Sequence, residues 1–254
     1  GVNVYFVAKA AAGLGLKVAL SGIGGDELFG GYDTFRQLPA VVGALGWVPG
    51  LRHAGAGLRA FAAPLMRPFV SPKYAGVLEY GTTYGDAYFL RRGLFMPWEL
   101  PGLIGVDMAR QGLRDLAFRE NLGACADAVD GAARKVTALE TAWYMRNQLL
   151  RDADWAGMAH SLEIRVPLVD ATLFAALAPG LGRPGGPDKQ AMATTPLPAL
   201  PDAVRARAKT GFAVPVRDWL RGSGPDGDLT LDTGADGRGL RGWAKQVYAA
   251  QWHG

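Results

Sequence analysis

The sequence has little of what several classes of protein depend on. It contains one cysteine, Cys125, so no disulfide can form within the chain, and a reducing compartment suits it. No apolar run approaches the ~20 residues of a membrane-spanning helix, because prolines and glycines interrupt the longest candidate, residues 38–51. The sequence also shows no signal peptide. These features predict a cytoplasmic protein that does not enter a membrane.

The net charge and the absence of certain motifs bear on further functional classes of protein. The net charge of +4 is modest, so it indicates an anionic substrate as readily as a nucleic acid, and we predict no nucleic-acid partner. The histidines lack zinc-site spacing, and no Gly-x-Ser-x-Gly motif indicates a serine hydrolase. Half of the 254 residues are apolar (49%), enough for one large domain or two small ones. The chain starts at Gly1 without an initiator Met, so we expect a piece of a longer protein.

The most informative stretch, residues 21–32, reads Ser-Gly-Ile-Gly-Gly-Asp-Glu-Leu-Phe-Gly-Gly-Tyr; we call it the glycine–acid turn. A short apolar run precedes it. Glycine has no Cβ, so a ligand can approach the backbone closely, and such turns bind anions through N–H groups. The acids Asp26 and Glu27 would repel a phosphate unless a cation lay between them. The sequence therefore predicts a nucleotide phosphate held through Mg²⁺, which prefers oxygen ligands.

Two familiar glycine motifs do not fit this turn. A dinucleotide fingerprint would need glycine where Glu27 stands, and a P-loop would need lysine where Gly31 stands. A tight turn that only ends a strand stays open as the alternative. The acids at the carboxyl end of the expected strand favour a ligand site, because open α/β sheets bind ligands there.

Hydrophobic periodicity predicts a helix over residues 4–14, a strand over 17–21 and a long helix over 132–151. One strand cannot form a sheet, and few convincing strands follow, so we expect its partners upstream of Gly1. Short amphipathic helices are expected between residues 34 and 78, where no acidic residue occurs. The Gly/Asp-rich composition predicts a loop over residues 222–239, and a terminal helix is expected within 240–254.

Two later stretches carry charge beside apolar residues. Residues 150–170 are dense in acids and arginines, and these charges need partners if the segment is half buried. Glu163 with Arg165, or Asp170, could supply them, as part of a structural ion-pair network. In the other stretch Lys209 stands close to Gly211, and a lysine beside a glycine turn can reach a phosphate as a point charge.

Three motifs in order resemble the synthetase domain of glutamine-hydrolysing asparagine synthetases, over residues 1–221. They are the glycine–acid turn, Arg-Asp-x-Asp-x-x-x-Met-Ala-His-Ser-Leu-Glu-Ile-Arg-Val-Pro-Leu-Val-Asp at 151–170, and Lys-Thr-Gly-Phe-x-x-Pro-x-x-x-Trp-Leu at 209–220. The resemblance implies an α/β fold of the adenine-nucleotide alpha-hydrolase (Rossmann-like) type. This chain would carry the end of the parallel sheet and a mostly helical C-terminal part.

The resemblance also implies a reaction. A carboxylate, aspartate in the family, is adenylated by ATP with Mg²⁺, pyrophosphate leaves, and ammonia attacks the acyl-adenylate. It implies that Asp26 holds Mg²⁺ and that Lys209 stabilises the departing pyrophosphate, which makes both catalytic. The nucleotide-binding positions that it implies are Ser21, Gly22, Gly24 and Gly25.

The chain departs from the family pattern in three ways. It lacks the pyrophosphate loop Ser-Gly-Gly-x-Asp-Ser, it lacks the glutaminase domain that supplies ammonia, and it has Ile23 where the family usually has Glu. We therefore expect the chain to be inactive alone. Three alternatives stay open: asparagine synthesis, amidation of another carboxylate, and a non-catalytic nucleotide-binding module. A homodimer is also open.

Overall fold

The computed structural model describes residues 1–66, 72–207 and 240–252. It is a mostly helical α/β structure with a small parallel sheet. The chain forms two compact units: Gly1–Pro39 with Cys125–Val214, and Ala40–Ala124 with Pro215–Gly254. Within the described ranges, no helix has the length and apolar character needed to cross a membrane.

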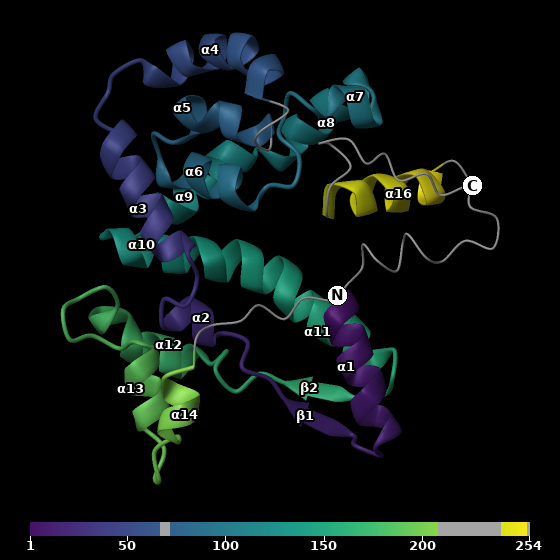
Figure 1. Cartoon of the computed structure of the whole chain (residues 1–254), viewed down its shortest axis with the longest axis vertical. Helices are drawn as coiled ribbons and strands as arrows, with labels where there is room; N and C mark the ends of the chain where they lie inside the picture. Colours follow the sequence, from purple (N-terminus) through teal and green to yellow (C-terminus); the bar gives the residue numbers. More distant parts are fainter. Residues whose placement is uncertain (67–71, 208–239, 253–254) are drawn as a thin grey trace. The chain divides into compact units, whose positions relative to one another are not determined.

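The first unit is built on a helix–strand pair. Helix α1 (Val2–Gly13) precedes strand β1 (Val18–Leu20), which pairs in parallel with β2 (Glu163–Arg165), with Val18 opposite Glu163. Figure 1 shows the two strands side by side, with α1 next to them. The helix and strand predicted over 4–14 and 17–21 are confirmed.

The position of the strand partner corrects the sequence prediction. We expected the partners of β1 upstream of Gly1, whereas β2 lies far downstream in the chain. Its three residues, Glu-Ile-Arg, alternate exposed, half-buried and exposed, so the strand places one apolar side chain inward. Such a short run inside a charged stretch has too little periodicity to be recognised.

A long helical run crosses the first unit. It consists of α10 (Ala132–Leu139), the π-helical segment η2 (Glu140–Leu149) and α11 (Leu150–Met158). Helix α11 packs against both α1 and β2. The sequence predicts one helix over 132–151; the structure extends it to Met158 and widens its middle into a π-helix.

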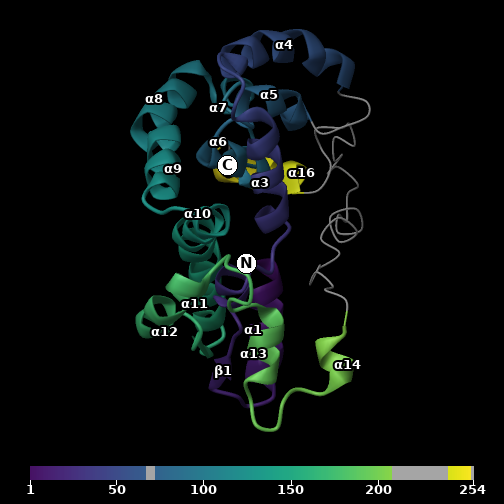
Figure 2. The ribbon, with the colours of Figure 1, turned by 90° about the vertical axis from the view of Figure 1, so that its left-hand side faces the viewer.

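Short elements complete the first unit. They are α2 (Gly25–Leu28), the start of α3 (Thr34–Leu45), α12 (Ala171–Leu177), η3 (Ala178–Gly180), α13 (Lys189–Thr194) and α14 (Asp202–Arg205). Figures 1 and 2 show α12, α13 and α14 in green at the lower end of the view. Asp170 and Asp188 accept the Leu173 and Ala191 N–H groups, each at 2.7 Å, and so begin α12 and α13 as N-caps.

The second unit is helical. It contains α4 (Leu51–Met66), η1 (Pro72–Gly76), α5 (Val77–Tyr80), α6 (Tyr84–Arg92), α7 (Pro101–Ile104), α8 (Val106–Leu116), most of α9 (Phe118–Asp127) and α16 (Leu240–Trp252). Tyr80, Leu90 and Met96 form its buried core, packed by neighbouring aromatic side chains. The aromatic residues of this region therefore serve as core, as their density predicts.

Ion pairs tie the helices of the second unit together. Glu79 pairs with Arg59 at 2.8 Å and with Arg119 at 3.6 Å, and Arg119 also pairs with Asp86 at 3.3 Å. Arg241 of α16 pairs with Glu99. In the acid-free stretch before Leu78, Arg59 is therefore not a solvated charge but pairs with a partly buried carboxylate.

Candidate functional site

The glycine–acid turn leaves the carboxyl end of β1. The Ser21 N–H donates to the Arg165 carbonyl of β2 at 2.8 Å, and the Gly25 N–H donates to the Gly22 carbonyl at 3.1 Å. Gly24 then adopts a left-handed conformation, φ +97°, and α2 begins. The turn therefore stands where parallel sheets present backbone groups to ligands.

The glycines of the turn differ in what surrounds them. A Cβ on Gly24 would lie 3.1 Å from the Leu168 carbonyl carbon and oxygen, and one on Gly25 would lie 3.1 Å from a Leu168 methyl group. Close packing against Leu168 therefore explains why glycine stands at both of these positions. At Gly22, by contrast, a Cβ would meet no described atom within 4 Å, and φ is not positive. Packing does not require glycine at position 22, and the space beside it can admit a ligand.

The two acidic side chains of the turn lie in different surroundings. The Asp26 side chain is 26% exposed and forms an ion pair with Lys189 of α13, whereas Glu27 is 1% exposed. The Tyr32 hydroxyl donates to Glu27 Oε1 at 2.8 Å. Burial raises the pKa of Glu27, and burial together with the adjacent Glu27 raises the pKa of Tyr32. Asp26 alone of the pair can reach a bound cation.

A lysine that the sequence did not single out completes this arrangement. Lys189 is half-exposed, and its Nζ pairs with Asp26 Oδ1. A Cβ on Gly31 would overlap both Asp26 and the Lys189 side chain, so a larger residue there would displace the ion pair. The one signal in the sequence is local: Asp188 caps the helix that Lys189 begins. Lys209, the lysine that we predicted, lies outside the described residues.

The predicted residues Ser21, Gly22, Gly24, Gly25 and Asp26 come together in this single turn. The Ser21 hydroxyl accepts the Ile23 N–H at 3.4 Å, which turns the serine side chain back over the loop. In the described part of the chain, no three His, Cys, Asp or Glu residues form a metal-binding group. One carboxylate suits Mg²⁺ all the same, because this ion commonly binds one or two carboxylates, several waters and substrate phosphates.

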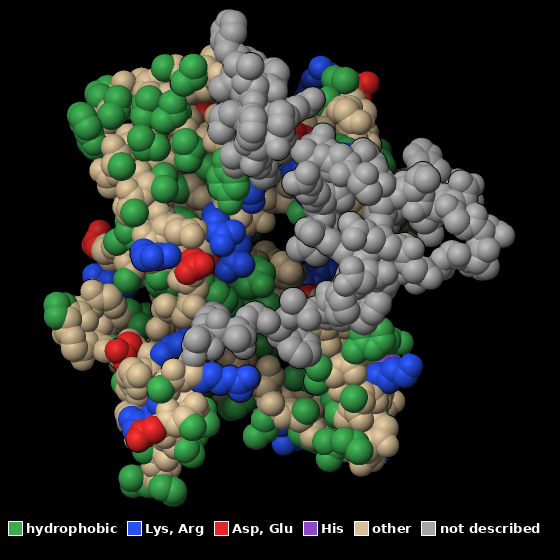
Figure 3. Space-filling view, viewed as in Figure 1, with side chains coloured by type: hydrophobic (Ala, Val, Ile, Leu, Met, Phe, Trp, Pro, Cys, Tyr) green, Lys and Arg blue, Asp and Glu red, His purple; other side chains and the backbone are tan. Residues whose placement is uncertain are grey.

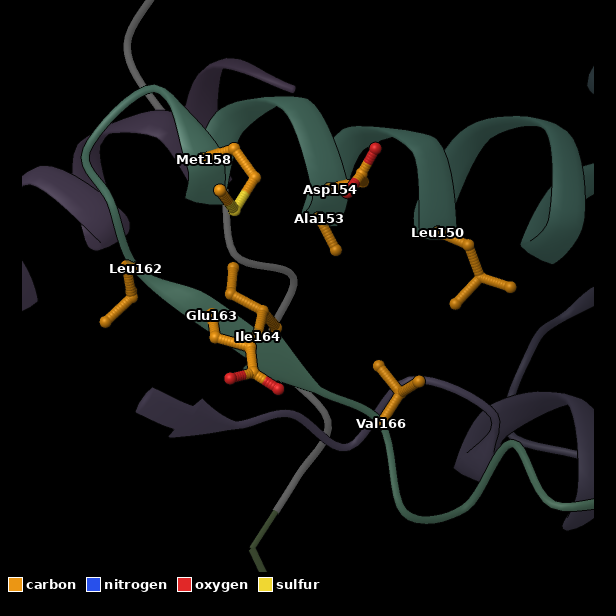
Figure 4. A pocket seen from close by; sticks show the side chains of 8 residues that line it. All are labelled: Leu150, Ala153, Asp154, Met158, Leu162, Glu163, Ile164 and Val166. Carbon is orange, nitrogen blue, oxygen red and sulfur yellow. The ribbon is translucent and has the colours of Figure 1, made fainter. Parts of the chain in front are cut away.

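A separate hollow lies between α11 and β2 (Figure 4). Leu150 and Ala153 point from the helix toward the strand, while the Glu163 carboxylate turns to the other side of β2. Its lining contains none of the predicted site residues. The hollow is mainly apolar, so we do not assign the nucleotide to it.

Cys125 and His160 lie outside the turn, and their surroundings are those of packed residues. Burial raises the pKa of the Cys125 thiol, which disfavours the thiolate that a nucleophile needs. The His160 ring packs edge-on against Tyr5, with centroids 4.4 Å apart. In the charged stretch, Glu163 pairs with Arg165 at 2.9 Å as expected, whereas Asp170 caps α12 instead.

Comparisons with known proteins agree with one another on the family that this chain is similar to. The family model described as asparagine synthase matches residues 1–236. A putative asparagine synthetase [glutamine-hydrolyzing] of Mycobacterium tuberculosis (strain H37Rv) is 31% identical over 223 residues, which cover 87% of this chain and 33% of that protein. Asparagine synthetase [glutamine-hydrolyzing] 1 of Bacillus subtilis (strain 168) is 31% identical over 228 residues, 87% of this chain and 34% of that protein.

The chain spans about a third of the length of the curated relatives it matches. No solved structure gives a significant match. The family match covers the glycine–acid turn, both strands and the charged stretch described above. The resemblance predicted from three motifs is therefore confirmed, and the chain belongs to the asparagine synthase family.

Proposed function

We propose that this chain is the C-terminal part of the synthetase region of an ATP-dependent amide-forming ligase. In the proposed reaction a substrate carboxylate oxygen attacks the α-phosphorus of ATP, and pyrophosphate leaves. Ammonia then attacks the acyl carbon and AMP departs with the carboxylate oxygen. The observation that carries the proposal is the open backbone at Gly22 in the same turn as the partly exposed carboxylate of Asp26, which pairs with Lys189.

The residues of the turn take separate roles in this proposal. Ser21 and Gly22 approach the nucleotide, since the backbone there is accessible. Gly24 and Gly25 shape the turn at the point where α2 begins. Asp26 would hold Mg²⁺, which would neutralise charge on the phosphates.

Two lysines supply positive charge in the proposed site. Lys189 lies beside Asp26, so both groups can serve the same phosphates. Lys209 is proposed, from the family resemblance alone, to stabilise the departing pyrophosphate. Positive groups placed where negative charge develops are a large source of rate enhancement in such transfers.

We also propose that the two strands belong to a larger sheet of the adenine-nucleotide alpha-hydrolase type. Val18 and Leu20 are 41% and 76% exposed, although parallel sheets are normally covered on both faces. Phe6, Val7 and Leu14 of α1 are exposed as well. In Figure 3 hydrophobic side chains cover much of the surface at lower right, where α1 and the strands lie in the same view. Additional strands would cover this apolar surface.

The proposal also concerns the source of the ammonia and the identity of the carboxylate that accepts it. The matched relatives carry the description glutamine-hydrolyzing, so we propose that a glutaminase domain outside this chain supplies ammonia. Ile23, half-buried in the turn, cannot accept a proton, which leaves aspartate or another carboxylate as the acceptor. The single cysteine supports a cytoplasmic location. A homodimer stays a prediction.

Pyrophosphate release tests the proposed function. Protein that carries this chain within the full synthetase length of its relatives should release pyrophosphate when given ATP, Mg²⁺ and the carboxylate. Asp26→Ala or Lys209→Ala should each lower that rate about 10²–10³-fold, the size of one lost electrostatic group. Near-normal turnover in the Asp26 variant would remove the site assignment. The 254-residue chain by itself should release none, and aspartate-dependent release by it would refute that expectation.

A non-catalytic nucleotide-binding module is the second candidate. Ile23 favours it, because an apolar side chain stands at the one position of the turn where the family usually has a proton acceptor. ATP binding without pyrophosphate release in the longer protein, whichever carboxylate is offered, would favour this candidate.

A further inference from the structure

Buried polar side chains gather behind the glycine–acid turn. Glu27, Thr34, Thr137 and Glu140 expose 1%, 2%, 7% and 0% of their surface; we call them the buried polar cluster. Among the residues that the structure describes, Asp86 is the only other polar or charged side chain buried to this degree. Burying a carboxylate costs free energy unless it is hydrogen-bonded, so two at one place need an explanation.

Hydrogen bonds connect this cluster to α2 and to the segment that follows it. Within α2, the main-chain carbonyl of Glu27, directly beside Asp26, accepts the Thr137 hydroxyl at 3.3 Å. After α2, at the first residue of α3, the Thr34 hydroxyl donates to Glu140 Oε1 at 2.5 Å. Both bonds lie within the first unit and join residues more than a hundred positions apart, so they fix the turn from outside its own segment.

One helical run supplies all of these contacts. Thr137 belongs to α10, and Glu140 and Tyr144 belong to η2; spacings of three and four place them on the same side. The Tyr144 ring packs edge-on against Tyr32, with centroids 5.8 Å apart. The contacts begin where the helix changes from α to π, and π-helical segments frequently occur at functional sites.

We propose that Glu140 and Thr137 are positioning residues for the metal-binding carboxylate of Asp26. Thr137 fixes the carbonyl of the residue after Asp26, and Glu140 fixes the segment after α2 through Thr34. Together they hold Asp26 in its partly exposed position beside Lys189 while its neighbour Glu27 stays buried. The inference rests on the proposed function, in which Asp26 binds the cation of the nucleotide. Glu140 is fully buried and acts only through other residues.

Substitutions of Thr34 test the proposal in the 254-residue chain. Thr34→Val removes the hydroxyl at nearly constant volume, and Thr34→Ser keeps it. Amide hydrogen exchange of residues 24–31 should speed up at least about tenfold in the Val variant, the loss of one hydrogen bond to a charged group. Mn²⁺ affinity in the presence of ATP, measured by electron paramagnetic resonance, should fall by a similar factor. The Ser variant should restore both.

Leu162→Ala is the matched control for a loss of stability alone. Leu162 is buried, but it precedes β2, whereas the turn leaves the opposite end of the sheet. This variant should lower Tm while leaving exchange at the turn and Mn²⁺ affinity close to those of the unmodified chain. Thr137→Val compared with Thr137→Ser tests the second contact in the same way, and decides the matter should Thr34→Val fail to fold.

The outcomes separate this proposal from the one on which it rests. Equal exchange at the turn in the Val and Ser variants would overturn the positioning role. So would a Leu162→Ala variant that loses as much Mn²⁺ affinity as Thr34→Val. Protein that carries the unmodified chain within the full synthetase length and binds no Mn²⁺ with ATP would count against Asp26 as a metal ligand, and the exchange comparison would still decide whether the cluster fixes the turn.

Discussion

Two glycines in the same turn should respond oppositely to alanine. Gly24 has φ +97°, and its Cβ would lie 3.1 Å from the backbone of Leu168, which cannot move aside as a flexible side chain can. Gly22 has no described atom within 4 Å of its Cβ position and no positive φ. Stability should therefore depend on Gly24 and ligand binding on Gly22.

The magnitudes follow from this geometry. A non-glycine residue forced into a left-handed conformation costs about 1–3 kcal/mol. For chains of this size each kcal/mol corresponds to about 2–4 °C, so Gly24→Ala should lower Tm by about 2–12 °C. Gly22→Ala meets no clash and restricts the unfolded chain, which leaves stability unchanged or improved by about 0.4–1 kcal/mol.

Thermal unfolding and ATP binding measured on the same two variants check this reasoning. Gly22→Ala should keep its Tm but bind Mg²⁺-ATP at least about tenfold more weakly, equivalent to about 1.4 kcal/mol, because its methyl group enters the space assigned to the nucleotide. Unchanged ATP affinity in Gly22→Ala would refute that assignment. A Gly24→Ala variant that melts with the unmodified chain would refute the backbone argument.

Two further predictions concern charge. Lys189→Ala removes the cation paired with Asp26, so Mn²⁺ alone should bind more tightly and Mn²⁺-ATP more weakly; a loss of affinity for Mn²⁺ alone would contradict the pairing. Burial raises the pKa of Asp86 above its usual value despite Arg119. Its stabilising contribution is therefore complete below the unfolded pKa of about 3.9 and is lost as pH rises through the higher folded pKa. The Tm of the unmodified chain relative to Asp86→Asn should fall from about pH 4 to 7, and parallel curves would contradict this.

Local features could be predicted because neighbouring residues determine them. Helix α1 follows from apolar spacing, and the turn at Gly22 to Gly25 follows from glycines after an apolar run. The choice of Asp26 as the exposed acid could not be predicted, since two adjacent carboxylates look alike in sequence. Their difference comes from Tyr32 and the helical run behind them.

Long-range contacts account for what the sequence did not predict. Strand β2 pairs with a segment far from it in the chain, and three residues are too short a run for their alternation to be recognised. Lys189 reaches Asp26 only through the packing of α13, and Glu140 meets Thr34 only because the helical run passes behind the turn. The cap Asp188 marks the start of the helix of Lys189, but no local feature predicts any of these three contacts.

The path of one oxygen atom tests the central claim most directly. An acyl-adenylate carries a bond between the substrate carboxylate and the α-phosphorus, so ¹⁸O from a labelled carboxylate must end in AMP when ammonia completes the reaction. Protein carrying this chain within the full synthetase length should transfer ¹⁸O from labelled aspartate, or from the carboxylate it uses, to AMP. Asp26→Ala should slow this transfer about 10²–10³-fold. Amide formation that leaves AMP unlabelled would contradict the account.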